Sequence, residues 1–348
     1  MSTFESVELN GVKENYARFE YKNKFVSSIQ AKIESGSLAF LETEDGELLG
    51  LLAVELTQAF KYGNDESLTA LHFVANELLN RRYLLVGDAV ELSPLMFKVQ
   101  QLIMGAQIDS DLAQVSEENL PVTAEQFRKW FSARSTKYEV STHPLFDYIR
   151  DHATMDQFHY FIETEAGVHA SFDDVIALNQ VGVRGAAKLE FFENFKDELG
   201  GSDPDRFHLA MFGRLISELE IGTVKKSSLA WQAMACGNYM LYLAHFRSLY
   251  HYCAGYLCFL EALTPNRFAS IAMGRKRLGL SGDGLAYHYE HSELDAKHAD
   301  GWLENIILSE INQKGAGVAK LFAKGVLLRE FASTRYWDSV LLKFRPNH

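Results

Sequence analysis

The sequence has few cysteines and no long apolar segment, and each shortage excludes a class of protein. Its three cysteines, Cys236, Cys253 and Cys258, form no CxxC pair and no disulfide framework. We therefore expect a reducing, cytoplasmic setting. No apolar run approaches the roughly 18 to 20 residues needed to cross a bilayer, so no membrane contact is expected. The first residues also lack the basic and apolar stretches of a secretion signal.

The chain also has fewer basic than acidic residues. The chain has 34 basic and 46 acidic residues and a net charge of -12, which disfavours binding to nucleic acid or to an anionic membrane. Hydrophobic residues make up 47% of its 348 residues, which is ample for a packed core. A role in the binding or conversion of a small molecule is therefore favoured.

Only six prolines interrupt the chain, and apolar residues recur at spacings of three and four. This pattern predicts an all-α protein, a bundle of helices with antiparallel neighbours. One expected helix opens at Asp203 and Pro204. The other expected helices span residues 68–86, 96–104, 155–178, 186–199, 229–263, 285–308 and 318–331. Pro265 would lie just past the end of the 229–263 helix.

The chain divides near Thr142, where the sequence THP is typical of a helix start, with Thr142 as the cap and Pro144 in the first turn. We expect an N-terminal helical region over residues 1–141 and a helical bundle over residues 142–348. The role of the N-terminal region stays open. It could pack against the bundle, form a homodimer contact or cover the mouth of a pocket.

The clearest local motif for chemistry is HSELDAKH. His291, Asp295 and His298 are four and seven residues apart, so on a helix they project from one face. Imidazole nitrogen and carboxylate oxygen together suit iron, manganese or zinc. The alternative is a solvated polar face, because Glu290 and Lys297 are close in sequence.

Three further places in the chain strengthen the metal interpretation. Glu261 lies in the apolar segment GYLCFLEALTP, where a carboxylate needs a partner, a metal or a raised pKa. In NFKDELGGSDPDRFH, Glu198 ends one helix and His208 begins the next, so a turn could bring both to one ion. Glu165 falls on an apolar helix stripe where leucine would be ordinary. Carboxylates and histidines that project inward from several helices are how di-iron sites are built.

These segments, in this order, resemble the haem-oxygenase-like di-iron oxidases, a family of non-haem iron enzymes with the haem oxygenase helical fold. ETEAGVHASFDDVIALNQVG is similar to the first ligand helix of that family, and AAKLEFFENFKDELGGSDPDRFH to its acidic segment followed by a histidine. GYLCFLEALTPNRF resembles the segment with the middle glutamate, and HSELDAKH the closing pattern. The resemblance covers residues 142–308 and implies a haem-oxygenase-like bundle.

The resemblance implies two iron ions, with dioxygen as cosubstrate and electrons from an external donor such as a reductase. The metal ligands it implies are Glu165, Glu198, His208, Glu261, His291, Asp295 and His298. Glu261 is the candidate to bridge the two ions. Asp173 and Asp174 are alternatives to Glu165, and His169 and His288 are weaker candidates.

The reaction implied is oxygenation or oxidation of a small molecule, and the full ligand set favours N-oxygenation of an amine or guanidine. Oxidative carbon–carbon cleavage or desaturation of an amino or fatty acid is the alternative. Arg247 and Arg214 are candidates to bind a substrate carboxylate of an amino-acid-like molecule. A metal-free helical binding module and a thiaminase-like or cofactor-maturation enzyme also share this type of fold, although no cysteine lies in a nucleophile motif.

Overall fold

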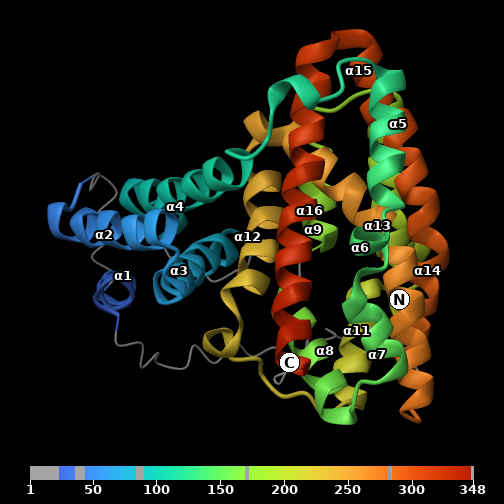
Figure 1. Cartoon of the computed structure of the whole chain (residues 1–348), viewed down its shortest axis with the longest axis horizontal. Helices are drawn as coiled ribbons and strands as arrows, with labels where there is room; N and C mark the ends of the chain where they lie inside the picture. The colour runs from blue at the N-terminus through green and yellow to red at the C-terminus, as the bar shows by residue number, and fades with distance from the viewer. Residues whose placement is uncertain are drawn as a thin grey trace, which may run out of the picture.

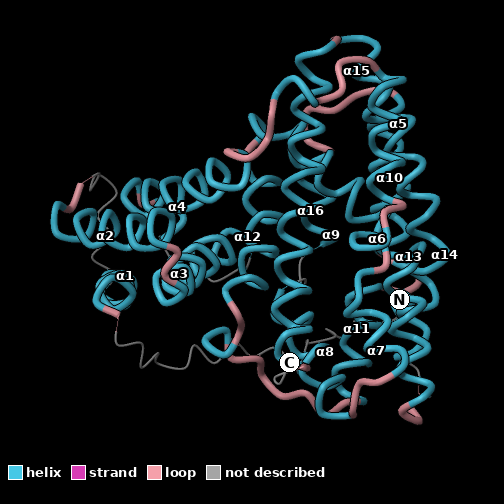
Figure 2. The backbone as a smooth tube through the Cα atoms, in the orientation of Figure 1, coloured by secondary structure: helices cyan, strands magenta, loops and turns pink. Residues whose placement is uncertain are grey.

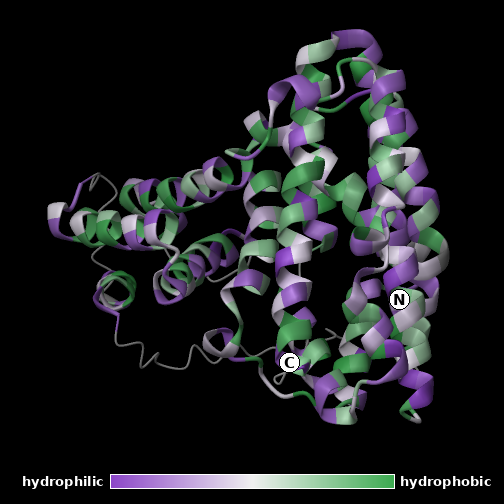
Figure 3. Cartoon of the chain, viewed as in Figure 1, coloured by the Kyte–Doolittle hydropathy of each residue, from purple (hydrophilic) through white to green (hydrophobic). Residues whose placement is uncertain are grey.

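The computed structural model describes residues 23–35, 44–83, 90–168, 172–280, 282 and 284–345. Within these ranges the chain is helical and contains no β-strand (Figure 2). The all-α prediction is therefore confirmed. None of the helices described is long and apolar enough to cross a membrane. Hydrophobic and hydrophilic residues alternate along the helices, as expected where each helix buries one face (Figure 3).

Four helices near the N-terminus form a group beside the main bundle (Figure 1). They are α1 Lys24–Ser35, α2 Gly46–Tyr62, α3 Asp65–Tyr83 and α4 Pro94–Leu112. α3 packs against α12 (Trp231–His245), and α4 contacts α16 (Ala316–Phe344). Asp45 and Ser93 cap α2 and α4, since their side-chain oxygens accept backbone N–H groups of the first turn.

The remaining helices build the main bundle, in which α13 lies along both α14 and α16 (Figure 1). Besides α12 and α16, they are α5 Ala124–Ser135, α6 Tyr138–Ser141, α7 His143–Asp151, α8 Met155–Val168, α9 Phe172–Asn179, α10 Ala186–Glu198, α11 His208–Glu218, α13 Tyr250–Arg277, α14 Gly284–Gly301 and α15 Ser309–Lys314. A π-helix, Trp302–Leu308, joins α14 to α15. Short 3₁₀ helices are Val90–Leu92, Glu117–Asn119, Gly200–Ser202, Pro204–Arg206, Lys226–Ser228 and Arg247–Leu249.

Several helix boundaries differ from the sequence-based expectation. α4 and α16 extend past the predicted ends at residues 104 and 331, and α11 begins at His208, after a separate 3₁₀ helix at Pro204–Arg206. The predicted end before Pro265 is wrong, because α13 continues through this proline to Arg277. A proline inside a helix lacks the N–H that would bond four residues back, here to the carbonyl of Glu261. Burial of α13 between its neighbours offsets that loss. The predicted 229–263 helix is instead divided by the turn at Arg247–Leu249.

Thr142 does precede a helix with Pro144 in its first turn, as predicted. Its side chain makes no capping hydrogen bond, however, so the prediction that Thr142 caps this helix through its side chain is wrong. The expected helix over residues 155–178 is described as α8 and α9, which lie on either side of residues 169–171. His169, one of the weaker ligand candidates, lies outside the described residues.

Candidate metal centre

Six of the seven predicted ligands come together in the bundle as two groups of three buried residues. The first, here called the His291 group, consists of Glu198, His208 and His291. The second, the His298 group, consists of Glu261, Asp295 and His298. Each residue offers one potential ligand atom, and the three atoms of a group all lie within 4.8 Å of one another. Glu198 and His208 belong to α10 and α11, Glu261 to α13, and the remaining three to α14.

The turn between α10 and α11 brings Glu198 and His208 together, as the sequence predicted. Nδ1 of His208 lies 2.8 Å from Oε2 of Glu198. The turn depends on Gly200, which has a φ of 65°. A Cβ atom at this position would lie 2.4 Å from the backbone carbon of Arg206, so no larger residue fits.

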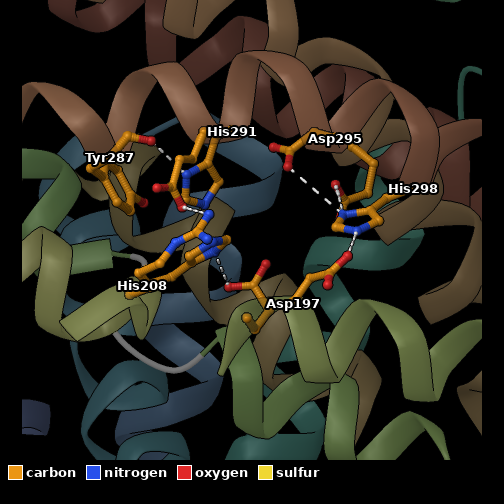
Figure 4. Close-up of polar contacts among 10 residues, drawn as sticks. Asp197, His208, Tyr287, His291, Asp295 and His298 are labelled. Carbon is orange, nitrogen blue, oxygen red and sulfur yellow. Dashed lines mark hydrogen bonds and ion pairs between the residues drawn. The ribbon is translucent and has the colours of Figure 1, made fainter. Parts of the chain in front are cut away.

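His291 completes the first group from the facing helix, α14. Its ring centre is 4.2 Å from that of His208, and Figure 4 shows the two rings close together. Nδ1 of His291 lies 2.8 Å from the carbonyl oxygen of Tyr287, one turn earlier. If Nδ1–H donates to that carbonyl, the tautomer leaves Nε2 of His291 with a free lone pair, the arrangement a metal ligand needs.

The His298 group contains buried polar atoms that no protein group satisfies. Nδ1 of His298 lies 3.8 Å from both Oε2 of Glu261 and Oδ1 of Asp295, too far for a hydrogen bond. Within the part of the chain that the structure describes, that nitrogen, Oδ1 of Asp295 and Oε1 of Glu261 have no hydrogen-bond partner. Unsatisfied buried polar atoms cost free energy, so three around one point indicate a site for a cation.

The motif on α14 therefore serves two groups and not one. His291 and His298 are seven residues apart, which places them roughly 10 Å apart along the helix axis. Ligands of a single ion cannot be separated by this distance, because metal–nitrogen bonds to histidine are only about 2 Å long. The shared face is as predicted, but His291 lies with Glu198 of α10 and His208 of α11, whereas Asp295 and His298 lie with Glu261 of α13.

Burial keeps His291 neutral, since it holds the pKa of this imidazole well below its usual range, and the neighbouring His208 acts in the same direction. At His208 burial opposes protonation, but the contact with Glu198 outweighs it and raises the pKa. At His298 burial is likewise outweighed, by Glu261 and by Asp197, and the pKa rises to about 9. Burial raises the pKa of Glu261 and of Asp295.

Glu165 is buried on α8 and lies outside both groups. Its Oε1 accepts a hydrogen bond of 2.8 Å from the hydroxyl of Tyr336 on α16. It lines a cavity of about 90 Å³ together with the His291 group and Asp295. Asp173 lines the same cavity, and burial raises its pKa, whereas Asp174 does not line it. Glu165 and Asp173 thus both stay candidates for a seventh ligand.

Neither arginine predicted to bind substrate lines this cavity. Arg247 donates to the carbonyl oxygens of Leu178 and Asn179 at the end of α9, at 3.2 and 3.4 Å. Arg214 donates to the carbonyl oxygen of Asp205. Both guanidinium groups are thus engaged by backbone, and the geometry gives no support to the predicted substrate contact.

Two residues that the sequence interpretation missed are close to the candidate ligands. Asp197 accepts a hydrogen bond of 3.1 Å from Nε2 of His298, and Arg267 lines the cavity. Asp197 precedes Glu198 directly, so the acidic pair in KDEL was a usable signal. Arg267 is a charge in an apolar stretch, the same signal that marked Glu261. His288, a weaker ligand candidate, also lines the cavity, and burial lowers its pKa to about 3.

The donor set fits iron. Histidine nitrogen and carboxylate oxygen are the ligands of non-haem iron, and neither group contains a cysteine. One ring nitrogen of His291 contacts the carbonyl oxygen of Tyr287, and one ring nitrogen of His298 contacts the carboxylate of Asp197. Such outer contacts are typical of metal-binding histidines.

Residues 159–330 match the model of a protein family described as iron-containing redox enzymes. This stretch contains all seven predicted ligands, and the match confirms the resemblance drawn from the sequence. Over these residues the chain is similar to the haem-oxygenase-like family of iron-containing redox enzymes. No curated protein matches the chain significantly.

Proposed function

We propose that this protein is a non-haem di-iron oxidase or oxygenase that uses dioxygen to oxidise a small molecule. The observation that carries the proposal is the presence of two separate groups of buried histidine and carboxylate side chains in one bundle. Each group has the number and kind of donors that one iron ion requires. The family match supports iron as the metal.

The charges of the buried residues also support two divalent ions. Glu165, Glu198, Glu261 and Asp295 together carry four negative charges when ionised, and two ferrous ions carry four positive charges. Without cations, so many buried carboxylates repel one another and are costly to ionise. In this proposal the ions take the place of the protons that burial favours on Glu261 and Asp295.

When bound, the iron pair would supply electrons to dioxygen and make it reactive toward a nearby substrate. The protein holds the ligands in place and shapes the space beside them. Phe161, Phe212 and Leu260 contribute an apolar wall to the cavity, which keeps water from the reacting groups. Glu165, held by Tyr336, lines the same cavity as the His291 group and would supply a further carboxylate there.

N-oxygenation of an amine or guanidine is the reaction we propose, because a seventh carboxylate ligand is typical of that branch of the family. Conversion of an amine to a hydroxylamine with dioxygen also forms water and consumes two electrons and two protons. An external donor, such as a reductase, would provide these electrons.

Iron content tests the two-site assignment. After anaerobic loading with ferrous salt and removal of excess metal, we expect two irons per wild-type chain by elemental analysis. His291→Ala and Glu261→Ala each alter a different group, so each variant should retain about one iron or less. Glu193→Gln, an exposed change on α10, is the control and should retain both. Wild-type iron content in both ligand variants would overturn the assignment.

The reaction is tested with the loaded wild-type protein, a chemical reductant and dioxygen. Amines, guanidines and amino acids are offered in parallel, and products are identified by mass spectrometry. N-oxygenation predicts a gain of oxygen that is labelled when ¹⁸O₂ is used. Loss of a carbon fragment or of two hydrogens would instead indicate cleavage or desaturation and would contradict the proposed reaction.

A further inference from the structure

Arg267 is a buried cation without a protein partner. Its side chain lies on α13, is only 4% exposed and lines the cavity beside the His291 group. Among the described residues it forms no hydrogen bond or ion pair, and its Nε and Nη1 atoms are buried and unsatisfied. An unpaired charge in a protein interior is strongly unfavourable, so a group that compensates it is expected.

The other two buried arginines in the described ranges differ in this respect. Nη2 of Arg275 is 2.9 Å from both carboxylate oxygens of Glu218. Arg329 donates to the Sγ of Cys236 and the hydroxyl of Tyr256. Arg267 instead lies beside two aromatic faces, since its guanidinium carbon is 4.9 Å from the centre of the Phe268 ring and 5.8 Å from that of Trp337. Such contacts stabilise a cation weakly compared with an anion.

Nearby charges leave a positive excess at this end of the cavity. Burial lowers the pKa of Arg267, and the negative charge of Glu165 raises it. The negative charge of Glu165 also favours the charged form of Arg329, whereas the positive charge of Arg329 lowers the pKa of Arg267. Glu165 therefore interacts electrostatically with both buried cations. In the proposed function Glu165 also helps to balance the charge of the iron ions, so Arg267 has no carboxylate of its own.

The position of Arg267 suits a small molecule held next to the metal ligands. The Phe268 ring contacts both the Arg267 guanidinium and the His291 imidazole, whose centre is 5.1 Å from that ring. The cation and this candidate ligand are therefore separated by one aromatic side chain. A cavity of about 90 Å³ has room for roughly six water-sized groups.

We infer that Arg267 binds the carboxylate of a small carboxylic-acid substrate and directs the rest of that molecule toward the His291 group. The planar guanidinium matches the two oxygens of a carboxylate, and the single negative charge of a carboxylate balances the single positive charge of Arg267. A phosphate would bring a second charge for which no further free cation lines the cavity. The inference rests on the proposed function, and it narrows the substrate to molecules such as amino acids.

Calorimetric binding under anaerobic conditions tests this inference without turnover. Propanoate, pentanoate, heptanoate and 5-aminopentanoate are titrated into the iron-loaded wild-type protein, and the amines of the same chain lengths and inorganic phosphate serve as comparison ligands. We expect at least one carboxylate to bind about tenfold to hundredfold more tightly than its matching amine, the range of hydrogen bonds to charged groups. Equal binding of acids and amines, no binding of any acid, or tighter binding of phosphate would overturn the inference.

Substitutions locate the binding to Arg267. Arg267→Met should abolish the preference for carboxylate, and Arg267→Lys should retain part of it, because the charge remains but the planar fork is lost. Arg184→Met, an exposed change, is the control and should bind as the wild type does. Arg267→Met should also be at least as stable as the wild type, since it removes an unpaired buried charge. Retained carboxylate preference in Arg267→Met would sink the assignment.

Parallel titrations of metal-free protein separate this inference from the proposed function. If the chain fails to take up iron but still binds carboxylates through Arg267, the di-iron proposal fails and the inference stands. If iron loads with the expected stoichiometry but carboxylates do not bind, only the inference fails.

Discussion

Oδ2 of Asp197 lies 3.1 Å from Nε2 of His298 (Figure 4), and the other ring nitrogen of His298 faces Glu261 and Asp295. The contact orients the imidazole and fixes which nitrogen carries the proton. A carboxylate behind a histidine ligand also makes that ligand more basic. Asp197 is therefore a positioning residue for the His298 group, although it belongs to neither group.

Removal of this contact should weaken metal binding without removal of a ligand. We expect Asp197→Ala to lower the affinity of the His298 group for ferrous ion by about tenfold to hundredfold. Competition with a coloured chelator under anaerobic conditions measures the change. The ferrous-ion affinity of Asp197→Asn should lie between those of the wild type and Asp197→Ala, since an amide oxygen can still accept a hydrogen bond from Nε2–H of His298. An unchanged affinity in Asp197→Ala would show that His298 needs no partner, and Glu193→Gln again serves as the control.

Two glycines set the close crossing of α13 and α16. A Cβ at Gly255 would lie 2.2 Å from the carbonyl oxygen of Phe322, and one at Gly325 would lie 2.1 Å from that of Tyr252. Each glycine thus faces the backbone of the other helix, which cannot yield as a side chain can. We predict that Gly255→Ala and Gly325→Ala each lower the free energy of unfolding by about 1 to 3 kcal/mol, measured in urea.

Gly317→Ala on α16 is the matched control for the glycine pair, because nothing lies within 4 Å of its added Cβ. In this exposed helical position alanine should raise stability by up to about 1 kcal/mol. Equal effects at the three positions would mean that helix propensity, and not the helix crossing, decides the outcome.

Asp111 on α4 ties the N-terminal helices to the bundle. Its two carboxylate oxygens lie 2.8 and 3.0 Å from the guanidinium of Arg335 on α16, and the hydroxyl of Tyr239 donates to it at 2.9 Å. Asp111 is buried, so its loss would leave both partners unsatisfied. We predict that Asp111→Ala lowers the free energy of unfolding by about 3 kcal/mol in urea.

An exposed ion pair on α5 provides the comparison for Asp111. Glu125 and Lys129 form a pair at 2.7 Å, and both side chains are largely exposed. Glu125→Ala should therefore leave the unfolding midpoint unchanged within error. If Asp111→Ala behaved in the same way, the contact between α4 and α16 would not be a determinant of stability.

Glu310 makes stability depend on pH at acid values. Burial opposes ionisation of this carboxyl, but hydrogen bonds from His251, Lys314 and Tyr250 outweigh it and lower the pKa to about 2. A carboxyl with a lowered pKa stabilises the fold above its unfolded pKa, and this contribution is lost as the pH falls toward the folded pKa. The stabilisation by Glu310 should therefore be complete at pH 7 and vanish near pH 2.

The comparison of Glu310→Gln with the wild type measures this contribution. We expect the variant to be less stable by about 1 to 2 kcal/mol at pH 7, with a difference that narrows below about pH 4. Chemical unfolding of both proteins across this pH range gives the difference directly. A difference that is constant with pH would show that the charge of Glu310 is not responsible.

Local sequence patterns predicted much of the fold and several details of the candidate site. The spacing of His291, Asp295 and His298 placed them on one helix face, and the glycines after Glu198 predicted the turn that brings it to His208. Both inferences depend only on residues close in sequence. The helix boundary before Pro265 failed, since packing on both sides of α13 outweighs the local cost of a proline.

Contacts between distant segments could not be predicted in this way. The acidic pair in KDEL marks Asp197 as a residue of interest, but the local sequence pattern did not predict its hydrogen bond with His298, because 101 residues separate the two. Nor did it show that Arg267 lines the cavity while Arg247 is held by the end of α9. A charge in an apolar stretch signals burial, but its partner depends on which helix packs against it.

The sequence by itself determined the all-helical class, the kinds of donor atoms and the shared face of His291, Asp295 and His298, because helical periodicity is a local property. Only the tertiary structure decided that this face serves two groups. Two turns of helix separate His291 from His298, so the two histidines meet carboxylates and histidines from different segments of the neighbouring helices. That packing, set by burial of apolar surface across the whole bundle, pairs His291 with Glu198 and His208 and leaves Glu261 to the His298 group.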